Sequence, residues 1–256
     1  MQTVTAADGT RIAYERHGAG PPLVLLHGSA GTRHAWDAVV PRLEAAFTVI
    51  VPDRRGRGAS GDADAHSLAR EIADLQAVLD TVEGTPTVFG HSYGGLVTLA
   101  AATGLALDRV ILYEPAVLVD GYRGDDLAAR MQARLDDGKR RDAMKLFFRE
   151  AGGVPAPEQL PIWPQDVDFD LVETVIRENR AVESYEVPPR PDIDCPTLLL
   201  TGERGPDHLR AGVRALADRI PQSRIVEFDG VGHVGTQSAP GTVADAVRSF
   251  CLETAQ

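Results

Sequence analysis

The sequence has few of the residues that indicate a disulfide framework, a metal site or a nucleic-acid-binding surface. Its two cysteines, Cys195 and Cys251, form no C-x-x-C pair and have no histidine close to them in sequence, so we expect free thiols, no metal ion and no organic cofactor. The formal net charge is −11, and no basic cluster is longer than Lys139-Arg140-Arg141. This balance disfavours nucleic acid as a partner.

Long apolar runs are also missing. No stretch of about 18 apolar residues occurs, and the first residues lack the charged and then apolar pattern of a secretion signal. We therefore expect no membrane partner and a cytoplasmic location. The chain does contain 256 residues with 43% hydrophobic content, which suits one large domain with a buried core.

The most informative segment is residues 87–95, TVFGHSYGG, where a β-prone run leads into a serine between glycines and then into a helix-compatible run. This context is typical of a nucleophile elbow, a tight strand-to-helix turn that holds its serine in a strained backbone conformation. Gly90 and Gly94 would remove the collisions of side chains two positions away. Ser92 is therefore the predicted nucleophile, with the first N–H groups of the following helix directed toward it.

A serine hydroxyl needs a base to take its proton and an acid to orient that base. His233 is the predicted base, because it lies in the glycine-containing loop DGVGH between an apolar run and a C-terminal helix. The other six histidines are interpreted as non-catalytic: His17, His66 and His208 at the surface, His34 on the polar side of a helix, His91 packed beside the serine turn, and His27 shaping a loop.

The loop that follows the apolar run at residues 23–26 is predicted to stabilise the oxyanion of a tetrahedral intermediate. The backbone N–H groups of Ser29 and Tyr93 are the expected donors, because preorganised donors of this kind raise acyl-transfer rates. Gly28 and Gly31 would let the loop approach the serine closely.

Together these motifs resemble the α/β-hydrolase family over nearly the whole chain. The His27-Gly28 loop, Trp36, the segment DRRGRG at residues 53–58, the serine turn and Gly232-His233 occur in the order and spacing of that family. Segment 53–58 is interpreted as a structural turn with its arginines at the surface, not as a binding site. The resemblance implies an α/β fold with a nucleophile, an acid and a histidine in that chain order.

The acid departs from the commonest pattern of the family. That pattern places an aspartate shortly after the strand at residues 197–201, where this chain has Gly205. Some family members carry the acid at the end of the preceding strand, and the segment RVILYEP at residues 109–115 places Glu114 there. Glu114 is therefore the predicted acid, with Asp207 as the second candidate and Glu203 as the third.

The coarse pattern alternates strands with helices. An Asp8-Gly9 turn is expected to join two N-terminal strands. Further strands are predicted near residues 22–26, 47–51, 86–90, 109–113, 196–201 and 224–228, and helices near 33–45, 67–82, 93–103, 207–219 and 239–253. This alternation predicts a mostly parallel central sheet covered by helices on both faces, with the functional residues at the carboxyl ends of the strands.

Residues 117–193 break the alternation, because they contain helical periodicity but no convincing strand. Residues 1–116 and 194–256 are predicted to form the core domain, and residues 117–193 a helical cap that excludes water and shapes the substrate pocket. Amphipathic helices are expected near Asp125 to Asp136, Arg141 to Glu150 and Asp168 to Glu186, with Phe169, Val172 and Ile176 at helical spacing. Candidates for lining an apolar cavity, or for the core of the cap itself, are Phe147, Phe148, Leu160, Ile162 and Trp163.

The sequence therefore predicts a hydrolase that cleaves a small or medium carboxylic ester, thioester or lactone through an acyl-enzyme. Its partner is a small molecule, uncharged or weakly polar. Carbon–carbon bond hydrolysis and cofactor-free perhydrolysis would use the same serine, and a non-enzymatic ligand-binding protein would keep the pocket without the chemistry. The oligomeric state is left open.

Overall fold

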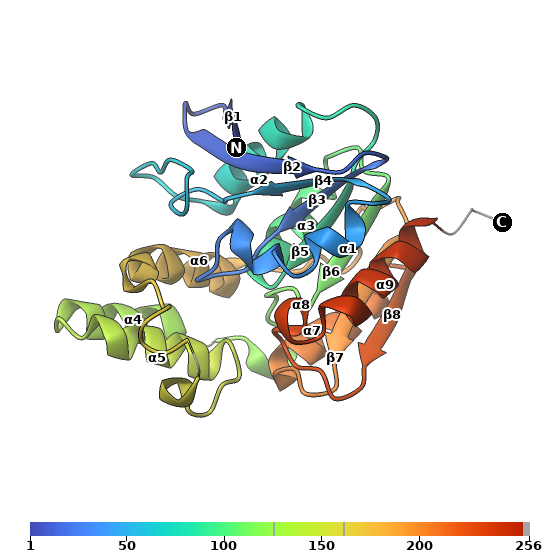
Figure 1. The fold of residues 1–256 in the computed structure, drawn as a ribbon. Coiled ribbons are helices and arrows are strands. Elements are labelled where there is room, and N and C mark those ends of the chain that lie inside the picture. Colours follow the sequence, from blue (N-terminus) through green and yellow to red (C-terminus); the bar gives the residue numbers. More distant parts are fainter. Residues whose placement is uncertain (125, 161, 253–256) are drawn as a thin grey trace.

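A computed structural model describes residues 1–124, 126–160 and 162–252 (Figure 1). Its centre is an eight-stranded sheet with the strand order β1-β2-β4-β3-β5-β6-β7-β8. Strands β1 and β2 run antiparallel to their neighbours, and the others pair in parallel. The strands are β1 Gln2–Thr5, β2 Arg11–His17, β3 Pro22–Leu26, β4 Thr48–Pro52, β5 Thr87–His91, β6 Arg109–Tyr113, β7 Thr197–Gly202 and β8 Ser223–Phe228.

Helices cover both faces of this sheet (Figure 1). One face packs against α2 (Leu68–Leu79), α3 (Tyr93–Ala101) and α7 (Asp207–Arg219). The other face packs against α1 (Val40–Leu43) and α9 (Pro240–Leu252), with the short helix α8 (Gly235–Ser238) leading into α9. The α/β fold with a mostly parallel sheet, predicted from the alternation, is confirmed.

The central strands β3 to β7 are mostly apolar because both of their faces are buried. On β3, Val24 and Leu26 belong to the hydrophobic cluster under α2 and α3, whereas Leu23 and Leu25 belong to the cluster under α1 and α9. Successive side chains of a strand point to opposite faces, so one short run supplies both cores. The carboxyl ends of these parallel strands then meet at one edge of the sheet.

The predicted elements lie within a few residues of the observed ones, with one exception. The Asp8-Gly9 hairpin is present, with Gly9 at φ 87° and the N–H of Thr10 donating to the Asp8 side chain. The helix predicted near residues 33–45 is wrong: this segment contains a 3-10 turn at Arg33–Trp36 and the single-turn helix α1. Pro41 lies at the start of α1, where its missing N–H is tolerated, so the chain begins a new helix there instead of continuing one.

Between residues 117 and 193, the described residues contain helices and no strand. The main helices are α4 (Leu127–Asp136), α5 (Arg140–Glu150) and α6 (Val172–Ser184), with short 3-10 turns at Asp120–Tyr122, Pro157–Gln159 and Phe169–Leu171. These helices share a hydrophobic cluster of their own, in which Val172 and Ile176 are buried and against which Phe169 packs, as their spacing predicts. The domain boundaries at 116/117 and 193/194 stay a prediction.

Three sequence predictions touch positions that lie outside the described residues. They are Asp125, the expected start of the first helix of segment 117–193, Pro161, a separator between its helices, and residue 253, the expected end of the last helix. In the described part of the chain, no helix has the length and apolar character needed to cross a membrane.

Candidate active site

Ser92 lies in the sharp turn between β5 and α3. Its backbone has φ 54° and ψ −120°, a conformation that side-chain-bearing residues rarely adopt. A Cβ at Gly90 would collide with the backbone of Gly94, and a Cβ at Gly94 would collide with the carbonyl of Leu26. Both glycines are therefore needed for the turn, as the sequence predicted. The strained conformation persists because the surrounding backbone holds it in place.

The structure brings Glu114 and His233 into direct contact. Glu114 is fully buried, and its Oε2 lies 2.7 Å from His233 Nδ1. Its Oε1 accepts hydrogen bonds from the hydroxyl of Thr201 and the N–H of Gly202, each at 2.9 Å. Because a carboxylate only accepts hydrogen bonds, His233 Nδ1 must carry the proton and Nε2 is left as the basic nitrogen of the neutral ring.

Gly205 explains how the carboxylate of Glu114 fits. A Cβ at this position would collide with the carboxylate oxygens of Glu114. The absence of a side chain at residue 205, the position where the commonest pattern has an aspartate, therefore leaves the space that the glutamate from β6 occupies. Glu114 itself has a positive φ of 41°, which is strained for a residue with a side chain.

The two other candidate acids lie elsewhere. Asp207 is exposed at the first residue of α7. Glu203 is also exposed, and its Oε2 accepts a hydrogen bond from the N–H of Gly230 at 2.7 Å. Of the three carboxylates that the sequence analysis ranked, Glu114 is the one whose side chain contacts His233.

Two buried side chains hold the loop that carries His233. The Nε2–H of His91 donates to the backbone oxygen of His233 at 2.8 Å, and the two rings lie 4.6 Å apart. The hydroxyl of Tyr113 donates to the oxygen of Gly232 at 2.6 Å. Burial, and then the neighbouring His233, lowers the pKa of His91 to about 3, so this ring stays neutral. His91 thus packs beside the serine turn, as predicted, and supports the loop of His233.

The loop after β3 lies directly against Ser92. A Cβ at Gly28 would lie 2.9 Å from the Cβ of Ser92, so glycine is required for this approach. A Cβ at Gly31 would make only ordinary contacts, and the expectation that Gly31 is needed for the approach is wrong. Ser29 lines the same cavity as Ser92, and Tyr93 is the first residue of α3.

His27 shapes this loop through both of its ring nitrogens. Its Nδ1 lies 2.9 Å from the oxygen of Gly28, and its Nε2 accepts the N–H of Arg54 at 3.2 Å. Burial, and then the charges of Arg54 and Arg57, hold the pKa of His27 well below its usual value. The prediction that His27 shapes a loop is confirmed.

Segment 53–58 is a structural turn, but the prediction that its arginines lie at the surface is wrong. Arg54, Arg55 and Arg57 are between 1% and 4% exposed. Arg54 donates to the oxygens of His27 and Gly28 at 3.0 and 3.2 Å, and its guanidinium lies over the ring of Tyr93. A buried guanidinium needs carboxylate partners, and these come from distant parts of the sequence.

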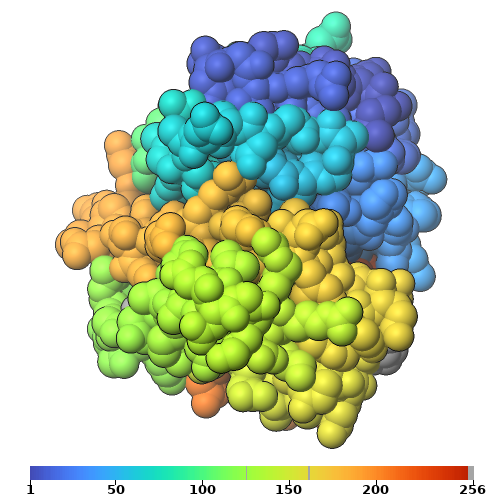
Figure 2. All heavy atoms as spheres, turned by 90° about the vertical axis from the view of Figure 1, so that its left-hand side faces the viewer, coloured from blue at the N-terminus to red at the C-terminus, as the bar shows by residue number. Residues whose placement is uncertain are grey.

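The carboxylate partners are Glu71 on α2 and Glu178 on α6. Arg54 contacts Glu71 at 2.9 Å and Glu178 at 2.6 Å, and Arg57 also donates to Glu178. Although burial raises it, the charge of Arg54 and the hydrogen bond from His66 bring the pKa of Glu71 down to about 2. Segment 53–66 and α6 lie side by side in Figure 2, where the cyan and orange surfaces meet.

His66 and His208 differ from their predicted surface positions. The side chain of His66 is 5% exposed and contacts Glu71 at 2.9 Å. His208 is half-buried and lines the cavity beside Ser92. No sequence motif predicts the burial of His66 or the place of His208 in the cavity wall, because both positions result from tertiary packing.

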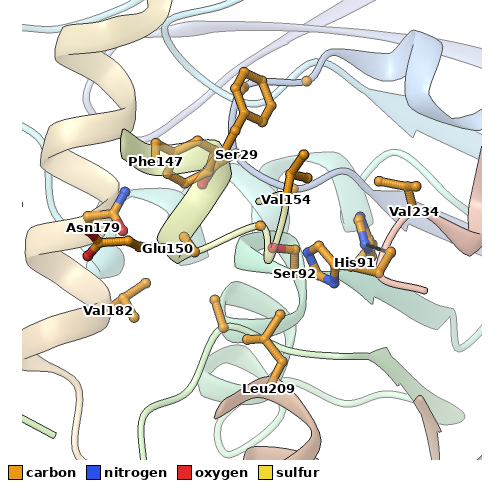
Figure 3. A pocket seen from close by; sticks show the side chains of 18 of the residues that line it. Ser29, His91, Ser92, Phe147, Glu150, Val154, Asn179, Val182, Leu209 and Val234 are labelled. Atoms are coloured by element: carbon orange, nitrogen blue, oxygen red, sulfur yellow. Dashed lines mark hydrogen bonds between the residues drawn. The ribbon is translucent and has the colours of Figure 1, made fainter. Parts of the chain in front are cut away.

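A cavity of about 720 Å³ lies between the sheet edge and the helices of segment 117–193, and Ser92 and His233 both line it. Figure 3 shows Ser92 and His91 toward one end, with Phe147 and Leu209 among the apolar side chains around them. Phe148, Leu160 and Ile162 line it too. Trp163 does not belong to the lining and packs instead against Phe148 and Phe169. In the described ranges, no three His, Cys, Asp or Glu side chains are grouped to hold a metal ion.

Comparisons with known proteins agree with this fold. Residues 23–246 match the Alpha/beta hydrolase family. A crystal structure of an alpha/beta hydrolase from Sphaerobacter thermophilus is 37% identical, covers 98% of this chain and 100% of its own, and superposes with a TM-score of 0.85. The chain therefore belongs to the Alpha/beta hydrolase family.

Two of the curated relatives that cover most of the chain differ in name. A protein named putative carbamate hydrolase RutD, from Azorhizobium caulinodans, is 27% identical over 95% of this chain and 96% of its own length. The magnesium-chelatase 30 kDa subunit of Rhodobacter capsulatus is 36% identical over 84% of this chain and 81% of its own length. The names of these two relatives therefore indicate different functions.

Proposed function

We propose that this protein is a serine hydrolase that cleaves a small or medium carboxylic ester, thioester or lactone through an acyl-enzyme. The observation that carries the proposal is the buried contact between Glu114 and His233 at the wall of the cavity that contains Ser92. A carboxylate that fixes the Nδ1–H tautomer prepares the opposite nitrogen to accept a proton from a serine hydroxyl. The kinship with a named carbamate hydrolase supports acyl chemistry of this kind.

In the proposed mechanism, the Oγ of Ser92 attacks the substrate carbonyl while His233 Nε2 takes its proton. The N–H groups of Ser29 and Tyr93 stabilise the oxyanion, and the close approach of Gly28 to Ser92 supports this assignment. The protonated His233 then donates to the leaving group. Water next attacks the acyl carbonyl while His233 takes its proton, and His233 passes this proton to Ser92 Oγ as the acid product leaves. Glu114 orients the ring and stabilises its positive charge throughout.

The helices of segment 117–193 form the far wall of the cavity, and we assign them the role of a cap that shapes the substrate site. The cytoplasmic location and the small-molecule partner stay predictions.

A fluorophosphonate probe and p-nitrophenyl esters test the proposal together. The wild-type protein should be labelled at Ser92 and should turn over short esters. Ser92→Ala should lose labelling and should reduce kcat by on the order of 10⁴-fold or more. A wild-type protein that neither reacts with the probe nor hydrolyses any ester would refute the assignment.

The alternative functions use the same site. Carbon–carbon bond hydrolysis would also begin at Ser92 and would appear as labelling without ester turnover. Perhydrolysis would begin there too and would appear as peracid formed from the acyl-enzyme when hydrogen peroxide is added. The third alternative is a non-enzymatic ligand-binding protein, which would keep the cavity without the chemistry. A protein of that kind would show neither labelling nor turnover.

A further inference from the structure

We propose that the end of the cavity away from Ser92 recognises a hydrogen-bond donor, a hydroxyl or an ammonium group, on the distal end of the substrate. This inference rests on the proposed function and names the substrate class of the same site. It is carried by Asn179 on α6, with Glu150 on α5 and Glu183 on α6 beside it in the lining of the cavity.

Asn179 is the one asparagine in the sequence, and its place is unusual for a polar side chain. It is 7% exposed and lines the cavity. Its Nδ2 donates to the oxygen of Val175 at 2.8 Å, so its Oδ1 is the atom of the amide that can accept a hydrogen bond. Because Asn179 lines the cavity, its amide oxygen is placed to accept a hydrogen bond from a donor on a bound molecule.

The neighbouring carboxylates make this end of the cavity rich in acceptors. Glu150 accepts hydrogen bonds from Arg130, which holds the carboxylate in place. Glu183 Oε1 accepts the N–H of Ala128 at 2.8 Å. Figure 3 shows Asn179 and Glu150 together at one side of the cavity, with Ser92 and His91 lying toward the other. A substrate that reaches this end meets oxygen atoms that accept hydrogen bonds.

The charges of the residues that line the cavity also favour a hydrogen-bond donor over an anionic group. The cavity is lined by the carboxylates of Glu150, Asp166 and Glu183, whereas no lysine or arginine is among its described lining residues. An anionic group would therefore lose its hydration without gaining a cationic partner. The remainder of the lining is mostly apolar, including Phe147, Val154 and Val182, so the chain between the ester and the donor is expected to be hydrocarbon.

The test uses p-nitrophenyl esters that share one acyl chain and differ only at its far end, which is a methyl, hydroxyl, ammonium or carboxylate group. The series is repeated with short, medium and long chains, because the donor must span the cavity. At the best length, the hydroxyl and ammonium esters should exceed the methyl ester in kcat/KM by roughly three- to tenfold. The carboxylate ester should be the slowest.

Asn179→Leu should bring the ratio of kcat/KM for the hydroxyl ester to that for the methyl ester close to one, whatever its effect on the methyl ester itself. Asn179→Asp retains the acceptor and adds charge, so it should raise the ratio of ammonium to carboxylate ester. Gln237→Leu is the matched control: this amide lines the same cavity but lies on α8, close to His233, so its loss should change all four esters by one common factor.

Two outcomes separate this inference from the proposed function. Ester turnover that is indifferent to the terminal group, or unchanged ratios in both Asn179 variants, would overturn the inference and leave the serine hydrolase standing. Absence of both turnover and fluorophosphonate labelling would overturn the proposed function and this inference with it.

Discussion

Two completely buried glutamates differ in their partners. Glu114, at the carboxyl edge of the sheet, contacts one imidazole and two neutral donors. Glu178, where α6 meets segment 53–58, contacts the guanidinium groups of Arg54 and Arg57. An imidazole can gain and lose a proton near neutral pH, whereas a guanidinium stays charged. The first arrangement is suited to proton transfer, and the second to holding two parts of the chain together.

The largest effect is expected for the carboxylate at the sheet edge. Glu114→Gln removes the charge that orients His233 and stabilises its protonated form, so kcat should fall by about 10³- to 10⁴-fold. Asp207→Ala, which removes an exposed carboxylate, should leave kcat within about threefold of wild type, as expected for a surface change. Steady-state kinetics with a p-nitrophenyl ester measures both. The reverse ranking would assign the acid to Asp207.

The second largest effect is expected on the free energy of unfolding, at the contact between α6 and segment 53–58. Glu178→Gln leaves Arg54 and Arg57 buried without their shared anion, so the free energy of unfolding should drop by about 3–5 kcal/mol. Glu173→Gln makes the same change on the same helix, but Glu173 is 55% exposed and pairs with the partly exposed Arg140, so it should lose less than about 1 kcal/mol. Urea unfolding of the two variants gives the comparison. Equal losses would show that the buried network contributes no more than a surface pair.

Gly205 tests the fit of the acid directly. Gly205→Ala places a methyl group where the carboxylate of Glu114 lies, and displacement of that carboxylate should reduce kcat by about 10²-fold. Gly104→Ala is the control, because a Cβ there meets no atom within 4 Å. Should Gly205→Ala keep wild-type kcat, the carboxylate must have room that the structure does not show.

The smallest expected effect is the change in the free energy of unfolding per pH unit. The pKa of His91 is lowered to about 3 and that of His27 is also lowered, so below about pH 6.5 the unfolded chain binds protons that the folded chain does not. Stability should therefore fall with decreasing pH, by up to about 1.4 kcal/mol per pH unit for each ring.

Glu71 is expected to cause a second loss of stability at lower pH. Its folded pKa of about 2 lies below the usual value, so its contribution is present above about pH 4.5 and is lost as the pH falls toward 2. Unfolding in urea at several pH values measures the slope. His91→Gln should reduce the slope between pH 6 and 5, and an unchanged slope would mean that the ring does not titrate as described.

The elements nearest to the candidate active site were the most predictable from sequence. The turn at Ser92 depends on local backbone geometry. The glycines that this geometry requires form a short motif, which can be recognised in the sequence. Glu114 was ranked first because some members of the family that the sequence resembles carry the acid at the end of this strand. The boundaries of most strands and helices agree within a few residues, since buried parallel strands are short apolar runs.

The buried arginines were missed for a physical reason. Segment 53–58 has the composition of a surface turn, and nothing within it indicates that Glu178, more than a hundred residues later, will pair with it. The position of His66 was missed in the same way, because its partner Glu71 is itself placed by the network.

The sequence alone determined the order of strands and helices, the turn at residue 92 and the three candidate acids. Local sterics and the burial of apolar residues act over a few positions, so they are visible in the sequence. Which acid contacts His233, and which arginines are covered by α6, depended on the packing of segments far apart in the chain. Such contacts exist only once the sheet has assembled and the space left by Gly205 has been formed.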